Sequence, residues 1–509
     1  MSTEDTSRPP SLSTAAPRVA TDGQVSVVAT ELRAGAIGLG GAIMTGITSS
    51  GPTLSVMFIV QFIVINAGLA APLAMVLGGV LMLLVALSST QLAKHLPSAS
   101  GYYAYVSRSL NPYWGFMATW LYLGAMIIAG AGVCLMLSGV IHNEVLRATG
   151  ANVPWWVWYL VFMGSVLSAA SRGISLSVKT ATILGAGEMI LLLALAVWGL
   201  ADPGKGGVSL KPFSPASAPS GNALFLALVF SVFIYTTWET QASIAEETAN
   251  PRRTVPRAMW MSVVFLVVFV VFTSYGILTG YGIDNTKQFA SATVLPGFTL
   301  AHQYWGPVWW LILFALLNSC LAACLSAGTC CNRLLYGMAR SGVLPKGWAS
   351  VSKRKVPTKI LYPQWALGTL AGLVLGLGFG TTNGYYVYGL VFTLGTVVIY
   401  VFACAGVVKF YSTERRAEFN VFKHLLLPVV AGGVVIYVLY KSFVPLPVGP
   451  GAWALPLFAA WFAIGGALLL TKVVRKDRDW LLHAGQVGEE SLTSTAELES
   501  KYAPVQSEA

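Results

Sequence analysis

The chain has 509 residues, of which 55% are hydrophobic and 10% are charged. Because a soluble domain carries about 25% charged residues, this composition excludes an ordinary soluble protein and indicates a helical membrane protein. The formal net charge of +11 would also suit a nucleic-acid binder, but the placement of the basic residues argues against one. Only five of the 31 lysines and arginines fall in segments expected on the exterior side of the membrane, and the other 26 fall in predicted cytoplasmic segments. This bias predicts cytoplasmic termini, a place in the cell membrane and contact with anionic lipids, without a nucleic-acid partner.

Apolar stretches long enough to cross a bilayer, about 20 residues, recur along the chain and predict an all-α polytopic protein of about 12 transmembrane helices. Short connections predict one membrane domain over residues 31–474, between a disordered cytoplasmic tail at 1–30 and a cytoplasmic tail at 475–509. We expect the spans at 34–66, 70–93, 113–141, 154–171, 177–200, 221–249, 256–282, 306–333, 360–379, 384–409, 424–441 and 451–474.

The first long apolar stretch is interrupted near its middle by Ser49-Ser50-Gly51-Pro52-Thr53. Proline has no amide hydrogen and clashes with the preceding helical turn, and glycine is conformationally free, so an unbroken helix is disfavoured. Pro52 suits the first position of a new helical segment, with Ser50 or Gly51 as its cap. The outer half-helix would then present free amides to the middle of the membrane. An ordinary proline kink is the alternative.

A second interruption is predicted in the sixth span, at Tyr235-Thr236-Thr237-Trp238-Glu239. Two β-branched threonines make a poor helix interior but a good helix start, and Thr236 and Glu239 have the spacing of a capping box. Interrupted spans at matching positions of two halves indicate an inverted-repeat transporter, with five-helix repeats at about 31–200 and 221–410 followed by helices 11 and 12. A zwitterion would fit between the carbonyls at one break and the amides at the other.

Four stretches of this sequence resemble the amino acid–polyamine–organocation (APC) superfamily. They are the Ser49-Ser50-Gly51 triplet in helix 1, the loop at residues 96–105, Thr237-Trp238-Glu239 with the run at 245–257, and the segment at 332–342 after helix 8. The resemblance covers residues 30–475. It implies a five-plus-five inverted-repeat fold with broken helices 1 and 6, and secondary active uptake of amino acids or related amines by alternating access.

The two interruptions supply the predicted substrate site. We expect the substrate carboxylate to bind the amides and hydroxyls of Ser49, Ser50 and Gly51. On helix 6, Phe233 resembles the aromatic residue of the family that closes over the substrate, with ordinary core packing as the alternative. The helix 6 candidates are Phe233, Ile234, Thr236 and Thr237. No further acid or base in this region selects a charged side chain, which favours neutral substrates.

Two intramembrane carboxylates are candidates for energy coupling. Glu188 stands alone among apolar residues in span five, and such a carboxylate is a functional-site candidate by default. We expect it to exchange a proton, with sodium binding or a purely structural hydrogen bond as alternatives. Glu239 can also carry a proton, although its place at a helix N-terminus explains it without transport. Asn318 and Ser319 in span eight are polar at midplane depth, where they could face the cavity or hydrogen-bond to a neighbouring helix. Serine or threonine oxygens of this span would complete a sodium site.

Other polar groups have simpler interpretations. Glu246 and Glu247 are expected to contact Arg252, Arg253 and Arg257 near an inner gate, and His142-Asn143-Glu144 to form solvated surface rather than a metal site. All six cysteines lie in or beside apolar stretches and are expected to be buried packing residues.

Motifs of enzymes and ATP-driven pumps are missing from the sequence. It contains no His-Glu-x-x-His motif, no Gly-x-Ser-x-Gly elbow and no phosphate-binding loop. We therefore expect no enzyme, no cofactor and no metal, and as partners an amino acid or amine, a coupling H⁺ or Na⁺, and membrane lipids. An amino acid exchanger of the same fold is an alternative, and a channel is a weaker one because no filter or charge ring is visible.

Overall fold

The computed structural model describes Gly35 and residues 37–98, 100–172, 178–350, 357–444, 446–474 and 480–481. These residues are nearly all helical, and within those ranges the β-structure is limited to an isolated bridge between Ile37 and Thr248. The described part of the chain contains nine helices that are long and apolar enough to cross a membrane. The predicted N-terminal tail at 1–30 lies outside the described residues. So does the predicted C-terminal tail, except for Trp480 and Leu481, which are buried.

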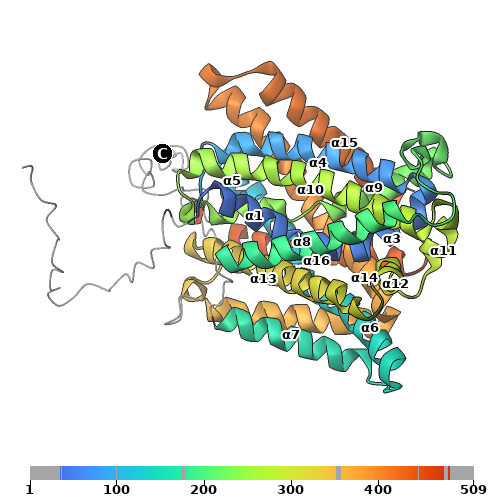
Figure 1. Ribbon diagram of the computed structural model, residues 1–509. Helices are drawn as coiled ribbons and strands as arrows, with labels where there is room; N and C mark the ends of the chain where they lie inside the picture. The colour runs from blue at the N-terminus through green and yellow to red at the C-terminus, as the bar shows by residue number, and fades with distance from the viewer. Residues whose placement is uncertain are drawn as a thin grey trace, which may run out of the picture. The chain divides into compact units, whose positions relative to one another are not determined.

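The helices follow one another through the whole described chain (Figure 1). Two segments, Ser55–Ile59 and Val421–Leu426, are π-helical, and ten residues at Trp238–Glu247 form a 3₁₀-helix. The α-helices are α1 (Leu39–Ser49), α2 (Pro52–Leu54), α3 (Val60–Ala67), α4 (Ala71–Ala93), α5 (Tyr102–Ser109), α6 (Pro112–Thr149), α7 (Trp155–Ser171), α8 (Val178–Ala201), α9 (Gly221–Ile234), α10 (Pro251–Tyr281), α11 (Thr286–Ser291), α12 (Pro296–Trp305), α13 (Trp310–Arg340), α14 (Thr358–Thr413), α15 (Leu427–Phe443) and α16 (Ala454–Val474).

Most predicted spans agree with these helices to within a few residues, and two end later than expected. Helix α6 runs to Thr149 rather than 141, because Arg147 pairs with Glu144 one turn earlier and supports the extra turns. Helix α13 continues to Arg340, beyond the predicted end at 333. The two spans expected at 360–379 and 384–409 correspond to the two parts of α14, which a kink at Gly380 (φ 78°, ψ 171°) separates.

Small residues allow the helices to pack closely in the interior. Helix α14 lies along α6, and α10 lies between α4 and α8 (Figure 1). A Cβ atom on Gly132 of α6 would lie 2.3 Å from the ring of Tyr388 on α14. A Cβ atom on Gly199 of α8 would lie 2.4 Å from the carbonyl oxygen of Gly276 on α10. Glycine at these two contacts lets the backbones approach, as membrane helices require when no hydrophobic force drives them together.

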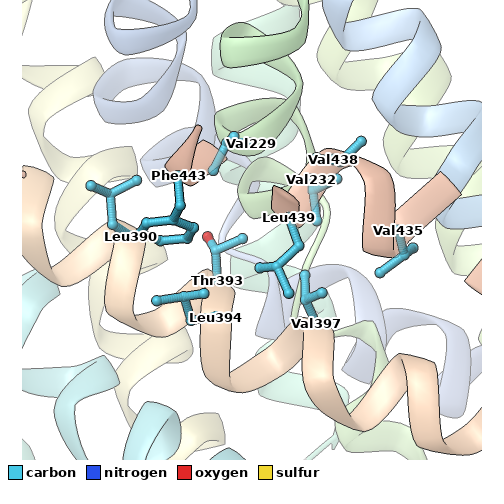
Figure 2. Close-up of a pocket in the computed structure, with 10 residues that line it drawn as sticks. All are labelled: Val229, Val232, Leu390, Thr393, Leu394, Val397, Val435, Val438, Leu439 and Phe443. Atoms are coloured by element: carbon cyan, nitrogen blue, oxygen red, sulfur yellow. The ribbon is translucent and has the colours of Figure 1, made fainter. Parts of the chain in front are cut away.

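Helix α15 packs on the outside of α4, α9 and α14. Figure 2 shows its contact with α9 and α14, where a crevice of about 10 Å³ remains between almost wholly apolar side chains. Thr393, the polar member, donates its hydroxyl hydrogen to the carbonyl of Gly389 within its own helix at 2.7 Å. The crevice therefore offers a ligand no polar partner, and it is a packing seam. Its lining consists of Val229, Val232, Leu390, Thr393, Leu394, Val397, Val435, Val438, Leu439 and Phe443.

All six cysteines are buried, as the sequence predicts. The segment at 202–220, predicted as a loop, contains two short 3₁₀ turns and is held by Tyr275, whose hydroxyl donates to the carbonyl of Ser209 at 2.8 Å. Trp480 packs edge-on against Tyr113, with ring centroids 5.6 Å apart.

Candidate functional site

The first predicted interruption is present. Helix α1 ends at Ser49, Gly51 adopts a left-handed conformation (φ 55°, ψ 74°), and Pro52 begins α2, as expected of a proline at the first helical position. Three residues later the chain enters the π-helical segment before α3 begins at Val60. A Cβ atom at Gly51 would lie 3.2 Å from Ser319 Oγ, so the positive φ and the close contact both favour glycine.

The amides of Ser50 and Gly51, which were expected to bind the substrate carboxylate, are hydrogen-bonded within the chain. The amide of Ser50 donates to Gly46 and Ile47, and the amide of Gly51 donates to the carbonyl of Thr48 at 3.1 Å. The last turn of α1 thus continues through Ser50 and Gly51 and uses the donors that were expected to face a carboxylate. On the outer side of the break, the Leu54 amide donates to the hydroxyl of Ser319 at 3.2 Å.

The second predicted interruption is also present, with a different cap. Helix α9 ends at Ile234, Thr237 has a positive φ of 76°, and the 3₁₀-helix follows from Trp238. The capping box expected between Thr236 and Glu239 is wrong, because the Thr236 hydroxyl donates backwards to the carbonyl of Phe233 at 2.7 Å. A non-glycine residue at positive φ is uncommon and costs free energy, so the surrounding structure must hold this break in place.

Hydroxyl groups join the two breaks. Ser50 Oγ donates to the carbonyl oxygen of Thr236 at 2.9 Å, and Thr237 Oγ1 donates to Ser50 Oγ at 3.3 Å. Thr240 Oγ1 donates to Ser49 Oγ at 3.1 Å, and Ser49 Oγ lies 2.6 Å from Ser326 Oγ on α13. Several of the hydroxyl groups that the sequence predicts as substrate ligands are therefore already hydrogen-bonded to other groups of the protein.

A cavity of about 40 Å³ lies at this junction. Five of the seven predicted substrate residues line it, namely Ser49, Ser50, Phe233, Thr236 and Thr237. Gly51 shapes the break without lining the cavity. Ile234 is buried, and its carbonyl accepts a long hydrogen bond from Ser55 at 3.4 Å. The rest of the wall comes from Leu54, Ser55, Ile59, Ala129, Val133, Ala323, Ala327, Tyr385, Tyr388 and Phe392.

The polar residues predicted in spans five and eight meet beside the first break. Glu188 of α8 is 3% exposed, and its carboxylate accepts hydrogen bonds from Asn318 Nδ2 at 2.7 Å and from Ser319 Oγ at 3.1 Å. Ser319 Oγ in turn accepts the Leu54 amide. A continuous chain of hydrogen bonds therefore links the Glu188 carboxylate to the first turn after the break in helix 1. Glu188 itself does not line the cavity.

Comparison with known proteins identifies the family of this chain. The sequence model of the amino acid permease family matches residues 41–478. The chain belongs to the amino acid permease family. The match also agrees with the APC superfamily motifs in the sequence.

Relatives of the permease are named as transporters. It is 23% identical over 406 residues to the branched-chain amino acid permease BcaP of Lactococcus lactis, covering 75% of this chain and 84% of that protein. It is 22% identical to the low-affinity putrescine importer PlaP of Escherichia coli, covering 70% of this chain and 78% of the importer. It is 24% identical to the D-serine/D-alanine/glycine transporter of Escherichia coli, covering 64% and 67% of the two chains. The match to the polyamine transporter PUT1 of Oryza sativa covers 54% of that protein.

Glu239 of the permease lies in the 3₁₀-helix Trp238–Glu247 and does not line the cavity. It is 1% exposed, and its two carboxylate oxygens accept hydrogen bonds from Tyr122 of α6 at 2.9 Å and from Tyr400 of α14 at 2.8 Å. The ring of Tyr400 stacks on Trp238, with centroids 5.8 Å apart. Glu239 thus bridges three elements of the permease instead of capping the 3₁₀-helix.

Glu247, one of the two acids predicted to form contacts near an inner gate, has an arginine partner that the sequence analysis did not name. Glu247 pairs with Arg333 of α13, with Arg333 Nη2 2.5 Å from the carboxylate. Arg333 also donates to the carbonyl of Ser243 at 2.9 Å. This pair fastens the end of the 3₁₀-helix to α13. Its side chains are 20% and 21% exposed, so water screens it less than a surface pair.

Helix α14 contributes residues that sequence reasoning missed. Tyr385, Tyr388 and Phe392 lie three to four residues apart and present one face to the cavity. Ala323 and Ala327 of α13 repeat at the same spacing. The helical spacing was available in the sequence. Aromatic and alanine residues are so frequent in this chain that the spacing alone did not separate a cavity wall from ordinary core packing.

Proposed function

We propose that this permease is a secondary active transporter that takes up neutral amino acids by alternating access. The observation that carries the proposal is the cavity at the junction of the two helix breaks, which hydroxyl-bearing residues at both breaks line together with aromatic residues of α14. Concave sites between membrane helices with a few convergent polar groups are typical of small-molecule binding.

The proposed topology is twelve helices in a five-plus-five inverted repeat. Nine described helices have the length and composition of a membrane span. Two of these stretches, Leu39–Ala93 and Thr358–Thr413, are 55 and 56 residues long and are interrupted at glycines, which is enough for two crossings each. The 17-residue apolar helix α7 would be the twelfth. The distribution of basic residues favours cytoplasmic termini and a place in the cell membrane.

The proposed substrate class follows from the chemistry of the cavity wall. The residues that line it include no acid, base or histidine, whereas a polyamine would need a carboxylate at its distal ammonium. Tyr385, Tyr388, Phe392 and Phe233 would contact an apolar side chain, and the hydroxyls of Ser49 and Ser50 would bind the substrate's carboxylate. A neutral amino acid matches both walls.

The cavity volume indicates a closed state in this proposal. About 40 Å³ holds a few waters at most, since one water needs roughly 10–15 Å³ measured in the same way. An amino acid would therefore need the aromatic wall to move outward. Release to the opposite side would require the pair of Glu247 and Arg333 to separate.

For energy coupling we propose that Glu188 carries one proton per cycle. Its contact with Ser319, and through Ser319 with Leu54, would link its protonation to the position of the first half-helix break. Sodium coupling, with Glu188 and span-eight oxygens as ligands, and obligatory exchange are the competing mechanisms. Glu239, held by two tyrosine hydroxyls, is the second coupling candidate.

Uptake into proteoliposomes tests the proposal. Purified permease should give saturable uptake of a neutral amino acid when screened against the twenty amino acids and common biogenic amines. The methyl ester of the best substrate should not compete, because it lacks the carboxylate. Uptake of amines alone, or an ester that competes as well as the acid, would contradict the proposed substrate class.

A further inference from the structure

One residue of the cavity wall carries a polar group that the protein leaves without a partner. Tyr385 of α14 is 1% exposed and lines the cavity of about 40 Å³ at the two breaks, which we call the central cavity. Within the described part of the chain, it is the lining residue whose side chain has a buried oxygen atom with no hydrogen-bond partner. Buried polar groups are nearly always hydrogen-bonded in native proteins, so this exception needs an explanation.

The serine and threonine hydroxyls of the same wall do have partners. Ser50 Oγ donates to the carbonyl oxygen of Thr236 at 2.9 Å, and Ser55 Oγ donates to the carbonyl oxygen of Ser50 at 2.8 Å. The Thr236 hydroxyl donates to the carbonyl oxygen of Phe233 at 2.7 Å. These groups keep a hydrogen bond inside the protein in the closed state, whereas the protein offers none to the hydroxyl of Tyr385.

Neighbouring aromatic rings hold Tyr385 in place. Its ring centroid lies 5.7 Å from that of Phe58 in the π-helical segment and 6.0 Å from that of Phe62 on α3. The rings of Phe233 on α9 and of Tyr388, one turn later on α14, lie at 6.2 and 5.3 Å. The hydroxyl is therefore held at a defined position in the wall, which suits a group that recognises a ligand.

An unpaired hydroxyl at this position discriminates between substrates. Water can hydrogen-bond to it while the cavity is open. Closure around an apolar side chain removes that water and leaves the hydroxyl unpaired, which is unfavourable. Closure around a side chain with its own hydroxyl or amide group replaces the lost hydrogen bond. A site that hydrogen-bonds a substrate group rejects analogues without that group far more strongly than an apolar pocket rejects a missing methylene group.

We propose that the Tyr385 hydroxyl is a specificity determinant of the permease, which favours neutral amino acids whose side chains carry a hydroxyl or an amide group. The hydroxyl binds the polar end of the substrate side chain, and the rings of Phe233 and Phe392 contact its carbon atoms. This inference rests on the proposed function, which assigns the substrate carboxylate to the breaks and the side chain to the aromatic wall. It narrows the substrates to serine, threonine, asparagine and glutamine.

Competition between two amino acids of the same shape tests this role, because valine carries a methyl group where threonine has its hydroxyl. Each is titrated against proteoliposome uptake of the tritiated amino acid that ranks first in the uptake screen. Threonine should inhibit uptake by the unmodified permease at a concentration lower than valine by about tenfold or more. Tyr385→Phe keeps the ring and removes the hydroxyl. Valine should then compete at least as well as threonine, whose buried hydroxyl would lack a partner.

Tyr105→Phe is the matched control. Tyr105 on α5 is also fully buried, its hydroxyl also has no partner, and it does not line the central cavity. Each of the two variants removes an unpaired hydroxyl, so neither should lower the temperature of thermal unfolding. Only Tyr385→Phe should change the ratio of the threonine and valine concentrations that inhibit uptake by half.

The outcomes separate this inference from the proposed function. Equal competition by threonine and valine in the unmodified permease, or a ratio that Tyr385→Phe leaves unchanged, overturns the role of Tyr385, while saturable uptake of a neutral amino acid still supports the proposed function. A lower unfolding temperature for Tyr385→Phe would reveal a structural partner of the hydroxyl and overturn the role as well. Absence of uptake for every amino acid and amine in the screen contradicts the proposed function itself, and the inference falls with it.

Discussion

Replacing Glu188 by glutamine separates its proposed coupling role from its structural one. The carboxylate accepts two hydrogen bonds from α13, from Asn318 at 2.7 Å and Ser319 at 3.1 Å. Glutamine has nearly the same shape and retains one acceptor oxygen, so about one interhelical hydrogen bond is lost. Such bonds average about 0.6 kcal/mol in membrane proteins and reach about 1.7 kcal/mol. The variant should therefore fold and bind substrate.

The functional effect should be larger than the effect on stability. If one carboxyl group carries one proton with each zwitterionic substrate, a gradient of one pH unit supplies about 1.36 kcal/mol, which supports roughly tenfold accumulation. Glu188→Gln cannot exchange this proton. We expect its accumulation ratio to fall to one while exchange of internal for external substrate continues.

Proteoliposomes provide the assay, with potassium and valinomycin holding the membrane potential at zero because each cycle would move one positive charge. Glu418→Gln, on the connection between α14 and α15, serves as a control and should accumulate substrate like the unmodified permease. Accumulation by Glu188→Gln under a proton gradient alone would refute the coupling role. Loss of accumulation on replacing sodium by choline at constant pH would assign the coupling to sodium.

Three further predictions concern stability and gating. Gly51→Ala should lower the free energy of unfolding by about 1–2 kcal/mol because Gly51 has a positive φ. Gly40→Ala is the control and should leave it unchanged, because a Cβ atom at Gly40 would meet nothing within 4 Å. Equal changes in the thermal unfolding of the two variants would contradict the prediction. Charge reversal at Glu247 or at Arg333 should slow uptake, and the double reversal should restore part of it; no recovery would argue against the pair as a gate. Burial, together with a neighbouring arginine, lowers the pKa of His302 in the folded protein. As the pH falls, the unfolded chain therefore binds a proton at His302 before the folded protein does. The free energy of unfolding should therefore decrease as the pH drops below about 6.5. The decrease should be smaller for His302→Gln, and thermal unfolding profiles with the same pH dependence for both proteins would contradict this prediction.

Local chemistry explains which parts of the site the sequence predicts. Glycine followed by proline, and two consecutive threonines before an acid, are poor helix interiors wherever they occur, so both breaks are visible without tertiary information. Glu188, Asn318 and Ser319 stand out because each is polar within an apolar span. Such groups seek partners inside the protein, and the structure brings these three together.

Packing between distant helices decides the rest. Tyr385, Tyr388 and Phe392 become a cavity wall because α14 turns that face inward along α6, and nothing local marks the face. The capping-box prediction is wrong, and the amides of Ser50 and Gly51 are already engaged, for a related reason. Thr236 bonds backwards to Phe233, and the last turn of α1 continues through Gly51, so the chain satisfies its own groups before a ligand arrives.

The central claim, that substrate passes through the cavity between the two breaks, is tested most directly by uptake in Ala327→Phe. Ala327 is 4% exposed and lines the cavity, so a phenylalanine ring would fill a space of about 40 Å³. Thr329→Phe, two residues along the same helix at an exposed position, is the matched control. We predict that Ala327→Phe folds yet shows no saturable amino acid uptake in proteoliposomes, while Thr329→Phe transports normally. Uptake by Ala327→Phe at the rate of the unmodified permease would contradict the account.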